Sequence, residues 1–108
     1  MKPDTTFTAD SEQVLGTLRV RVAGELDLSS EPVVIEIVKG KLEKPNLHRV
    51  VIDVTDVTFI DSSGLRALLR CRDEAARHDV PFTLQLGGNP QVERLLAVAG
   101  VESWFGYE

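Results

Sequence analysis

The sequence predicts a single α/β domain in which helices pack against a largely parallel β-sheet. Short stretches alternate apolar and polar residues, as strands do, and longer stretches repeat apolar residues every three or four positions, as helices do. These two kinds of segment follow one another along the chain, as in parallel sheets with right-handed helical crossovers. A length of 108 residues supports one modest core. We therefore expect one domain over residues 1–108, with the polar residues 1–6 frayed.

The composition and charge exclude several classes of protein. Of the 108 residues, 43% are hydrophobic, which is too high a fraction for a disordered tail. The formal net charge is −5 and the basic residues form no run. We expect no nucleic-acid partner, because phosphate binding needs clustered Lys and Arg. We also expect no membrane partner, since the apolar runs are far shorter than the roughly 20 residues that cross a bilayer.

The cysteine and histidine content points to a cytoplasmic protein without a cofactor. Cys71 is the only cysteine and cannot form an internal disulfide. The start of the chain lacks the basic residues and apolar block of a secretion signal. One thiol excludes a Cys-based zinc site, and His48 and His78 have no partner at ligand spacing. We therefore predict a cytoplasmic protein with no cofactor and no metal site.

Apolar patterns predict three strands in the first half of the chain. Residues 7–9 open a first strand that ends in a turn at residues 10–12. Residues 18–22 alternate apolar and polar side chains, which predicts a second strand that ends at Gly24. The apolar run at residues 50–54 is typical of a strand buried on both faces of a parallel sheet.

Residues 31–42 carry signals for both a helix and a strand. Ser29 or Ser30 can cap a helix whose first turn holds Glu31 and Pro32. The β-branched residues at 33–38, taken alone, favour a strand. Further apolar residues recur at the spacing of one helix face, which decides for a helix. They are Val34, Ile37, Val38 and Leu42.

A long amphipathic helix is predicted to begin at Ser62, and its apolar stripe is expected to face the sheet. The stripe consists of Leu65, Leu68, Leu69, Arg72, Ala75 and Ala76. Cys71 lies between this stripe and its flank, so we expect a half-buried thiol in a packing role.

The C-terminal third repeats the order of strand and helix. Alternating apolar residues over 82–86 predict a strand, and Asn89 and Pro90 then supply the cap and first turn of a helix that Gly100 ends. The inner face of this helix consists of Val92, Leu95, Leu96 and Ala99. We expect the aromatic residues 104–105 to close the core.

The most informative stretch runs from Ile52 to Leu65, and it puts Asp61-Ser62-Ser63-Gly64 at a junction between loop and helix. The first N–H groups of a helix have no intrahelical acceptor and its dipole is positive there, so a hydroxyl or an anion is well accommodated. Gly64 has no side chain, so another protein can approach the serine pair closely. Four letters alone recur by accident, and Asp61 or Ser62 is then only a helix cap worth about 1 kcal/mol.

The setting of this motif is more specific. Gly24-Glu25-Leu26-Asp27 and Phe59-Ile60-Asp61-Ser62-Ser63-Gly64-Leu65 lie about thirty-five residues apart. Together with residues 89–101 they resemble the STAS family, and within it the bacterial anti-sigma-factor antagonists, over a span from about Phe7 to Phe105. The resemblance implies a single STAS-like domain with a four-to-five-stranded, mixed and largely parallel sheet flanked by helices. It also implies no catalytic activity.

The resemblance further implies a protein partner and a covalent switch. In such antagonists the first serine of the motif, here Ser62, is phosphorylated by an anti-sigma factor that is also a serine kinase and carries the Mg-ATP. The unphosphorylated form binds this kinase and releases the sigma factor, and phosphorylation abolishes binding. A phosphatase would reverse the modification.

The resemblance also locates a partner-binding surface. It places Asp27 near the helix start, on the face that binds the kinase. We expect the partner-binding residues to be Asp27, Asp61, Ser63, Gly64, Leu65 and Arg66. A phosphate on Ser62 would add about −1.5 to −2 charge beside Asp61, so like-charge repulsion would weaken docking.

Three other functions fit parts of the sequence. A receiver-like site would use Asp53, Asp56 and Asp61 to hold Mg²⁺ and accept a phosphoryl group, but it needs a late lysine, and the last one is Lys44. We expect Asp53 to end or orient a strand and Asp56 to form a turn. A hydrolase pairing Ser62 with a histidine lacks the Gly-x-Ser-x-Gly motif. A STAS scaffold that assembles with itself remains open.

Overall fold

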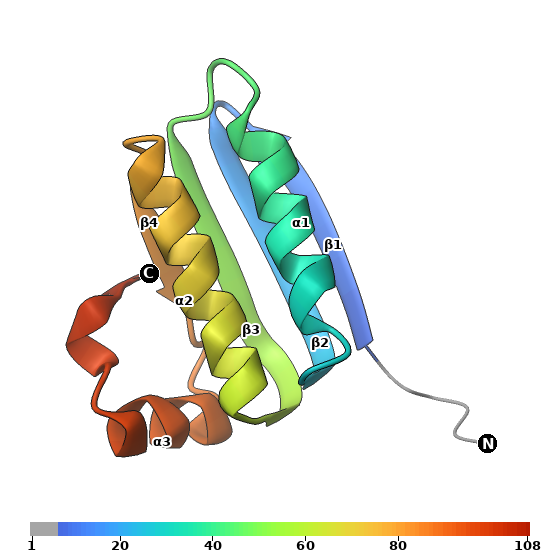
Figure 1. Cartoon of the computed structure of the whole chain (residues 1–108), viewed down its shortest axis with the longest axis vertical. Helices are drawn as coiled ribbons and strands as arrows, with labels where there is room; N and C mark the ends of the chain where they lie inside the picture. The colour runs from blue at the N-terminus through green and yellow to red at the C-terminus, as the bar shows by residue number, and fades with distance from the viewer. Residues whose placement is uncertain (1–6) are drawn as a thin grey trace.

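The computed structural model describes residues 7–108 (Figure 1). The expectation that residues 1–6 are frayed lies outside the described residues. The elements are β1 (Phe7–Val14), β2 (Thr17–Leu26), α1 (Glu31–Leu42), β3 (Arg49–Ile60), α2 (Ser62–Arg77), β4 (Phe82–Gln85), α3 (Pro90–Ala99), the short 3₁₀ helix η1 (Glu102–Trp104) and β5 (Gly106–Tyr107).

The strands form one mixed sheet in the order β1-β2-β3-β4-β5. The pair β1 and β2 is antiparallel, and the other three pairs are parallel. Helices α1 and α2 lie side by side over one face of the sheet, and α3 packs near the end of β3 (Figure 1). The predicted α/β class with a mixed, largely parallel sheet is confirmed. Among residues 7–108, no helix is long and apolar enough to span a membrane.

The first strand is longer than its pattern predicts. The turn expected at residues 10–12 is wrong, because β1 continues to Val14 and pairs there with Thr17 of β2. The chain reverses instead at Leu15 and Gly16, whose φ angles of 51° and 84° suit a tight two-residue hairpin. Most of β1 is exposed at the edge of the sheet, so it carries polar side chains. A pattern of apolar residues therefore does not reveal its full length.

Strands β2 and β3 also run further than expected. The predicted end of β2 at Gly24 is wrong, since pairing with β3 continues to Leu26. The run at residues 50–54 is only the middle of β3, and Asp56 lies within the strand rather than in a turn. Two irregularities in register interrupt the pairing. A bulge disturbs the alternation of side chains, so the sequence shows an apparent end where the strand continues.

One side chain stabilises the first of these bulges. Between Arg21 and Ala23 of β2, strand β3 advances from Asp53 to Asp56, one residue more than its partner. The Asp53 carboxylate accepts hydrogen bonds from Thr55 N at 2.9 Å and Thr55 Oγ1 at 2.6 Å. Asp53 therefore supports the extra residue within β3 and does not end the strand.

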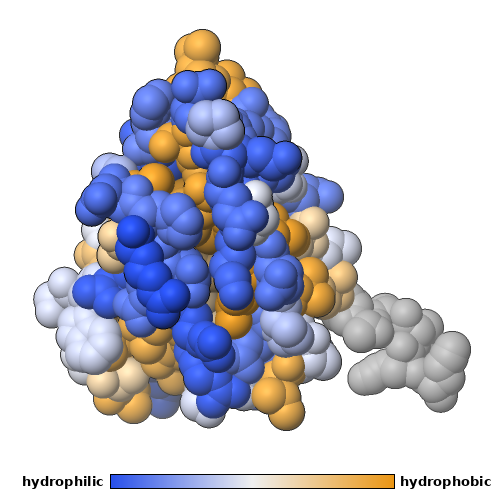
Figure 2. All heavy atoms as spheres, turned by 45° about the horizontal axis from the view of Figure 1, so that its top comes forward, coloured by the Kyte–Doolittle hydropathy of each residue, from blue (hydrophilic) through white to orange (hydrophobic). Residues whose placement is uncertain are grey.

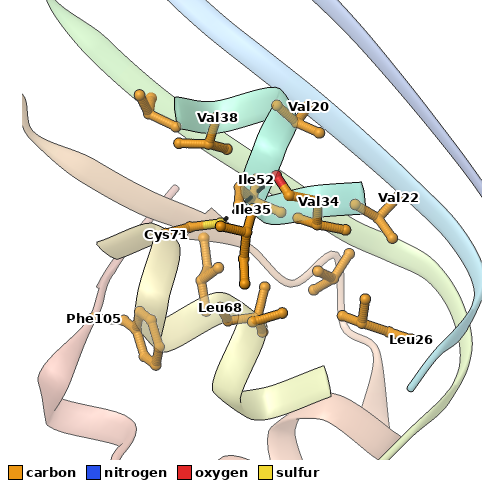
Figure 3. Packing of buried hydrophobic residues seen from close by; sticks show 14 of the residues in the cluster. Val20, Val22, Leu26, Val34, Ile35, Val38, Ile52, Leu68, Cys71 and Phe105 are labelled. Carbon is orange, nitrogen blue, oxygen red and sulfur yellow. Dashed lines mark hydrogen bonds between the residues drawn. The ribbon is translucent and has the colours of Figure 1, made fainter. Parts of the chain in front are cut away.

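The core lies between the sheet and the two parallel helices (Figure 3). Strand residues such as Val20, Val22 and Ile52 meet Val34 of α1 and Leu68 of α2, and all five are completely buried. Apolar side chains in this arrangement contribute about 1.5–3 kcal/mol each relative to exposure. The inner face of α2 turns slightly away from the predicted stripe, because Ala67 is buried and Ala76 is exposed.

Cys71 lies in the middle of this core. The half-buried position predicted for it is wrong: it is completely buried between α2 and α1, with its sulfur 3.9 Å from the carbonyl oxygen of Val34 (Figure 3). Burial raises the pKa of the Cys71 thiol to about 12. Because the thiolate is the reactive form, this cysteine serves packing.

The C-terminal segment confirms most of its predicted elements. Asn89 Oδ1 accepts from Gln91 N and Val92 N and so caps α3, and Gly100 ends that helix with a left-handed φ of 73°. The same Asn89 amide donates to the carbonyl oxygens of Val54 and Val57, which fixes α3 against the irregular part of β3. Two packing details differ from the prediction, because Ala99 is exposed and Trp104 is half exposed, whereas Phe105 is buried.

Candidate functional site

The predicted loop-to-helix junction lies at the end of β3. Asp61 is the N-cap of α2 in an extended conformation, and its Oδ1 accepts from Ser63 N at 2.9 Å and Gly64 N at 3.0 Å. These bonds satisfy two backbone donors that a helix start otherwise leaves without partners. Ser62 is the first helical residue and is exposed, while Ser63 is half-buried.

Gly64 has an internal role that the sequence interpretation missed. It is buried, and a Cβ there would overlap the Leu26 carbonyl oxygen and lie 2.8 Å from Ile60 Cγ1. The glycine therefore lets the first turn of α2 pack directly against the end of β2. This close approach is made within the chain, and the expectation that Gly64 also opens the serine pair to another protein stays a prediction. Leu65 is buried too, at 8% exposure.

Asp27 organises the loop between β2 and α1. Its Oδ1 accepts from Ser29 Oγ at 2.8 Å and from the backbone N–H groups of Ser29 and Ser30. The Ser29 hydroxyl, helped by these N–H groups, holds the pKa of the Asp27 carboxyl below its ordinary value. The sequence predicted a side-chain cap from Ser29 or Ser30, but the Ser30 side chain makes no cap hydrogen bond to α1. Its Oγ accepts from Asp27 N at 2.8 Å and donates to Glu25 O at 2.9 Å.

The Asp27 loop and the start of α2 lie at the same end of the sheet (Figure 1). Asp61 N donates to the carbonyl oxygen of Leu26, the residue directly before Asp27, at 3.4 Å. The structure thus brings Asp27, Asp61 and Ser62 to one edge, where the parallel strands β2 and β3 end.

Arg66 joins this edge to α1 through a contact that sequence analysis did not reveal. Its Nε donates to Oε2 of Glu31 at 2.6 Å, and its Nη2 donates to Oε1 at 2.8 Å. The Glu31 side chain is 9% exposed and that of Arg66 is 52% exposed. The Arg66 hydrogen bonds chiefly hold the pKa of Glu31 below its ordinary value. The partners are far apart in sequence, so no local pattern links them.

A shallow groove of about 440 Å³ runs beside this ion pair between α1 and α2. It is lined by Leu28, Glu31, Pro32, Ile35, Glu36, Lys39, Arg66 and Arg70. In the view of Figure 2, hydrophilic residues cover much of the surface, with hydrophobic residues between them. The groove therefore combines both charges with apolar contact area.

The three aspartates of a receiver-like site do not meet. The Asp53 carboxylate is buried against Thr55, with Arg21 Nε 3.9 Å away, and Asp61 caps α2. Among residues 7–108, no three His, Cys, Asp or Glu side chains gather as possible metal ligands. The arrangement offers an exposed serine at a capped helix start rather than a set of metal ligands.

The protein is a small α/β domain. Its sheet is mixed and five-stranded, two helices cover one face, and an exposed serine begins a helix at the end of that sheet. The family model described as STAS domain matches residues 8–107. The chain belongs to the STAS family, which confirms the resemblance inferred from its motifs.

An individual relative matches a smaller part of the chain than the family model does. A STAS-domain containing protein of Pseudomonas aeruginosa is 34% identical over 58 residues, which are 54% of this chain and 56% of that protein. The match thus spans little more than half the length of this curated relative.

Solved structures resemble the fold over nearly the whole chain. An anti-sigma factor antagonist from Mycobacterium paratuberculosis has a TM-score of 0.82 at 22% identity, covering 99% of this chain and 89% of that one. The phosphorylated form of the Bacillus cell fate determinant SpoIIAA has a TM-score of 0.72 at 18% identity, covering 94% and 91%. At this level of identity the likeness shows a shared fold.

Proposed function

We propose that this protein is an anti-sigma-factor antagonist that is switched by phosphorylation of Ser62. Its unphosphorylated form binds an anti-sigma factor that is also a serine kinase, and the sigma factor is released. The observation that carries the proposal is the exposed position of Ser62 as the first residue of α2. Structural neighbours named as anti-sigma-factor antagonists support the same role.

The surroundings of Ser62 suit a protein partner. Leu28 follows Asp27 and is 66% exposed, and Phe59 lies near the end of β3 and is 47% exposed. Both belong to the same end of the sheet as the serine. Exposed apolar side chains beside charged groups are typical of protein interfaces, where they supply contact area and the charges supply specificity. We infer that Asp27, Asp61, Ser63 and Arg66 contribute the polar part.

Phosphorylation would oppose docking through charge. The phosphate adds about −1.5 to −2 charge next to the Asp61 carboxylate. Like charges juxtaposed across an interface cost several kcal/mol, and a thousandfold weaker complex needs only about 4 kcal/mol. The fold itself would persist, since Ser62 is exposed and the start of a helix favours negative charge.

In this role the chain is a substrate and a binding module rather than an enzyme. The kinase supplies Mg-ATP and the base that activates the hydroxyl, and this chain supplies the acceptor oxygen. A phosphatase would restore the binding form. For such an exchange of protein partners we propose a cytoplasmic location, which is also what the sequence predicts.

The proposal is tested by incubating the protein with candidate anti-sigma kinases and Mg-ATP and mapping the modified residue by mass spectrometry. We expect phosphate on Ser62, and we expect Ser62→Ala to bind the kinase without accepting phosphate. Ser63→Ala controls for the position of the modification: it should still receive phosphate on Ser62, even where the loss of a polar contact weakens kinase binding. Phosphate on Ser63, or undiminished kinase binding by the modified protein, would contradict the assignment.

Size-exclusion chromatography distinguishes this role from a scaffold. An antagonist should shift to larger size only when the kinase is added. Large assemblies formed by the protein alone would favour the scaffold instead.

A further inference from the structure

Arg66 lies one helical turn after the proposed phosphate acceptor. Residues four apart on a helix are neighbours, with their Cβ atoms about 5–6 Å apart. Helical side chains lean toward the N-terminus, so the Arg66 side chain inclines toward the first turn of α2. The Glu31 carboxylate chiefly, and Asp61 to a smaller extent, raise the pKa of Arg66, as expected for a guanidinium near that turn.

Glu31 holds this guanidinium by one edge and leaves the other edge available. The two bonds to Glu31 use Nε and Nη2. Within residues 7–108, the hydrogen bonds of Arg66 use these two nitrogens, and none uses Nη1. An arginine carries five N–H donors in a rigid planar fork, so an arginine fixed at one edge can present the remaining donors in a defined direction.

We propose that Arg66, held in place by Glu31, binds the phosphate of phosphorylated Ser62 through its Nη1 edge. This inference rests on the proposed function, because it assumes that Ser62 is the acceptor. Glu31 acts as a positioning residue. Guanidinium groups bind phosphate strongly through charge-assisted hydrogen bonds, and the i, i+4 spacing places both groups on one helix face.

The phosphate joins the Glu31–Arg66 pair rather than replacing Glu31. The Glu31 side chain is only 9% exposed, and removing its cation would leave a carboxylate with little access to water and no partner. Arg66 therefore bridges two anions, one from α1 and one at the start of α2. The phosphate is retained on this chain, and a guanidinium available to a partner in the unmodified form becomes occupied.

The experiment places phosphoserine at position 62 by genetic encoding and follows its second ionisation by ³¹P NMR at about 0.15 M salt. Arg66 favours the dianion, so Arg66→Gln should raise the second pKa of the phosphate by about one unit. Arg70→Gln is the matched control, because Arg70 lies eight residues after Ser62, about 12 Å away along the helix axis and beyond the Debye length of about 8 Å. It should change this pKa little.

The double variant Glu31→Gln/Arg66→Gln guards against misfolding, because it leaves no carboxylate without a cation. The second pKa of the phosphate should be higher in the double variant than in Glu31→Gln alone. This difference should match the one between Arg66→Gln and the parent. Equal shifts for the Arg66 and Arg70 variants, or none for either, would overturn the inference. The measurement needs no kinase, so its failure leaves the assignment of Ser62 intact, and a failed kinase reaction leaves the phosphate contact intact.

Discussion

Within the motif at residues 61–64, the contacts that stabilise the fold are made by Asp61 and Gly64 rather than by Ser62. Asp61 bonds two backbone N–H groups, and buried Gly64 permits contact with β2. Ser62 is the one exposed residue of this motif, since Asp61 and Ser63 are half-buried and Gly64 is buried. Substitutions at Ser62 therefore test partner binding, whereas changes at Asp61 or Gly64 also alter the stability of the fold.

We predict opposite effects of alanine at two helical glycines. Gly64→Ala should lower the free energy of unfolding by about 1–3 kcal/mol, because its methyl group would overlap the backbone of Leu26. Gly40→Ala should raise it by about 0.5–1 kcal/mol, since Gly40 lies exposed in α1 with nothing within 4 Å of its added Cβ. Urea unfolding measures both.

The stability of Gly64→Ala also tests how the site is packed. If Gly64→Ala is as stable as the parent, α2 can move away from β2 at no cost, and the close packing at the site does not position the serine.

At the scale of elements, helices were more predictable than strand ends. The caps of α2 and α3 depend on Asp61 and Asn89, which act on backbone groups two or three residues away. Strand ends depend on pairing with distant residues. The bulge at Asp53 and the exposed edge of β1 interrupt the alternation of apolar and polar residues, so the strands continue beyond the ends that this alternation predicts. The junction at Ser62 was predictable because a capped helix start is local.

The pairing of α1 with α2 through Glu31 and Arg66 leads to a prediction about pH. The folded state holds the pKa of Glu31 below its ordinary value of 4.5. Its contribution is therefore present above pH 4.5 and is lost as the pH falls through the lower, folded-state value. Glu31→Gln should be less stable than the parent at neutral pH, and this difference should shrink on acidification below about 4.5.

Thermal unfolding between pH 7 and pH 3 checks this prediction. Glu36→Gln is the control, because Glu36 is an exposed carboxylate on the same helix. A stability difference for Glu31→Gln that stays constant with pH would show that its carboxylate has no ionic role in joining the helices.

At the scale of the whole molecule, the parallel strands determine what gathers at one end. Strands β2 and β3 end together, and α1 and α2 begin there (Figure 1). Asp27, Ser62 and the Glu31–Arg66 pair therefore occupy the same region although they come from distant parts of the chain. The STAS resemblance placed Asp27 near Ser62, but no sequence pattern identified the cation that joins α1 to α2.

The net charge of the whole chain leads to the last prediction. The chain already carries −5, so negative charge added at Ser62 meets little long-range compensation. Ser62→Asp should bind the kinase weakly at about 0.1 M salt and recover part of its affinity, relative to the parent, near 1 M, where the Debye length falls to about 3 Å. Ser62→Asn has the same shape without the charge and should bind like the parent at both concentrations. Calorimetric titration measures all three proteins. If Asn weakens binding as much as Asp does, the interface excludes the larger side chain by size, and repulsion does not operate the switch.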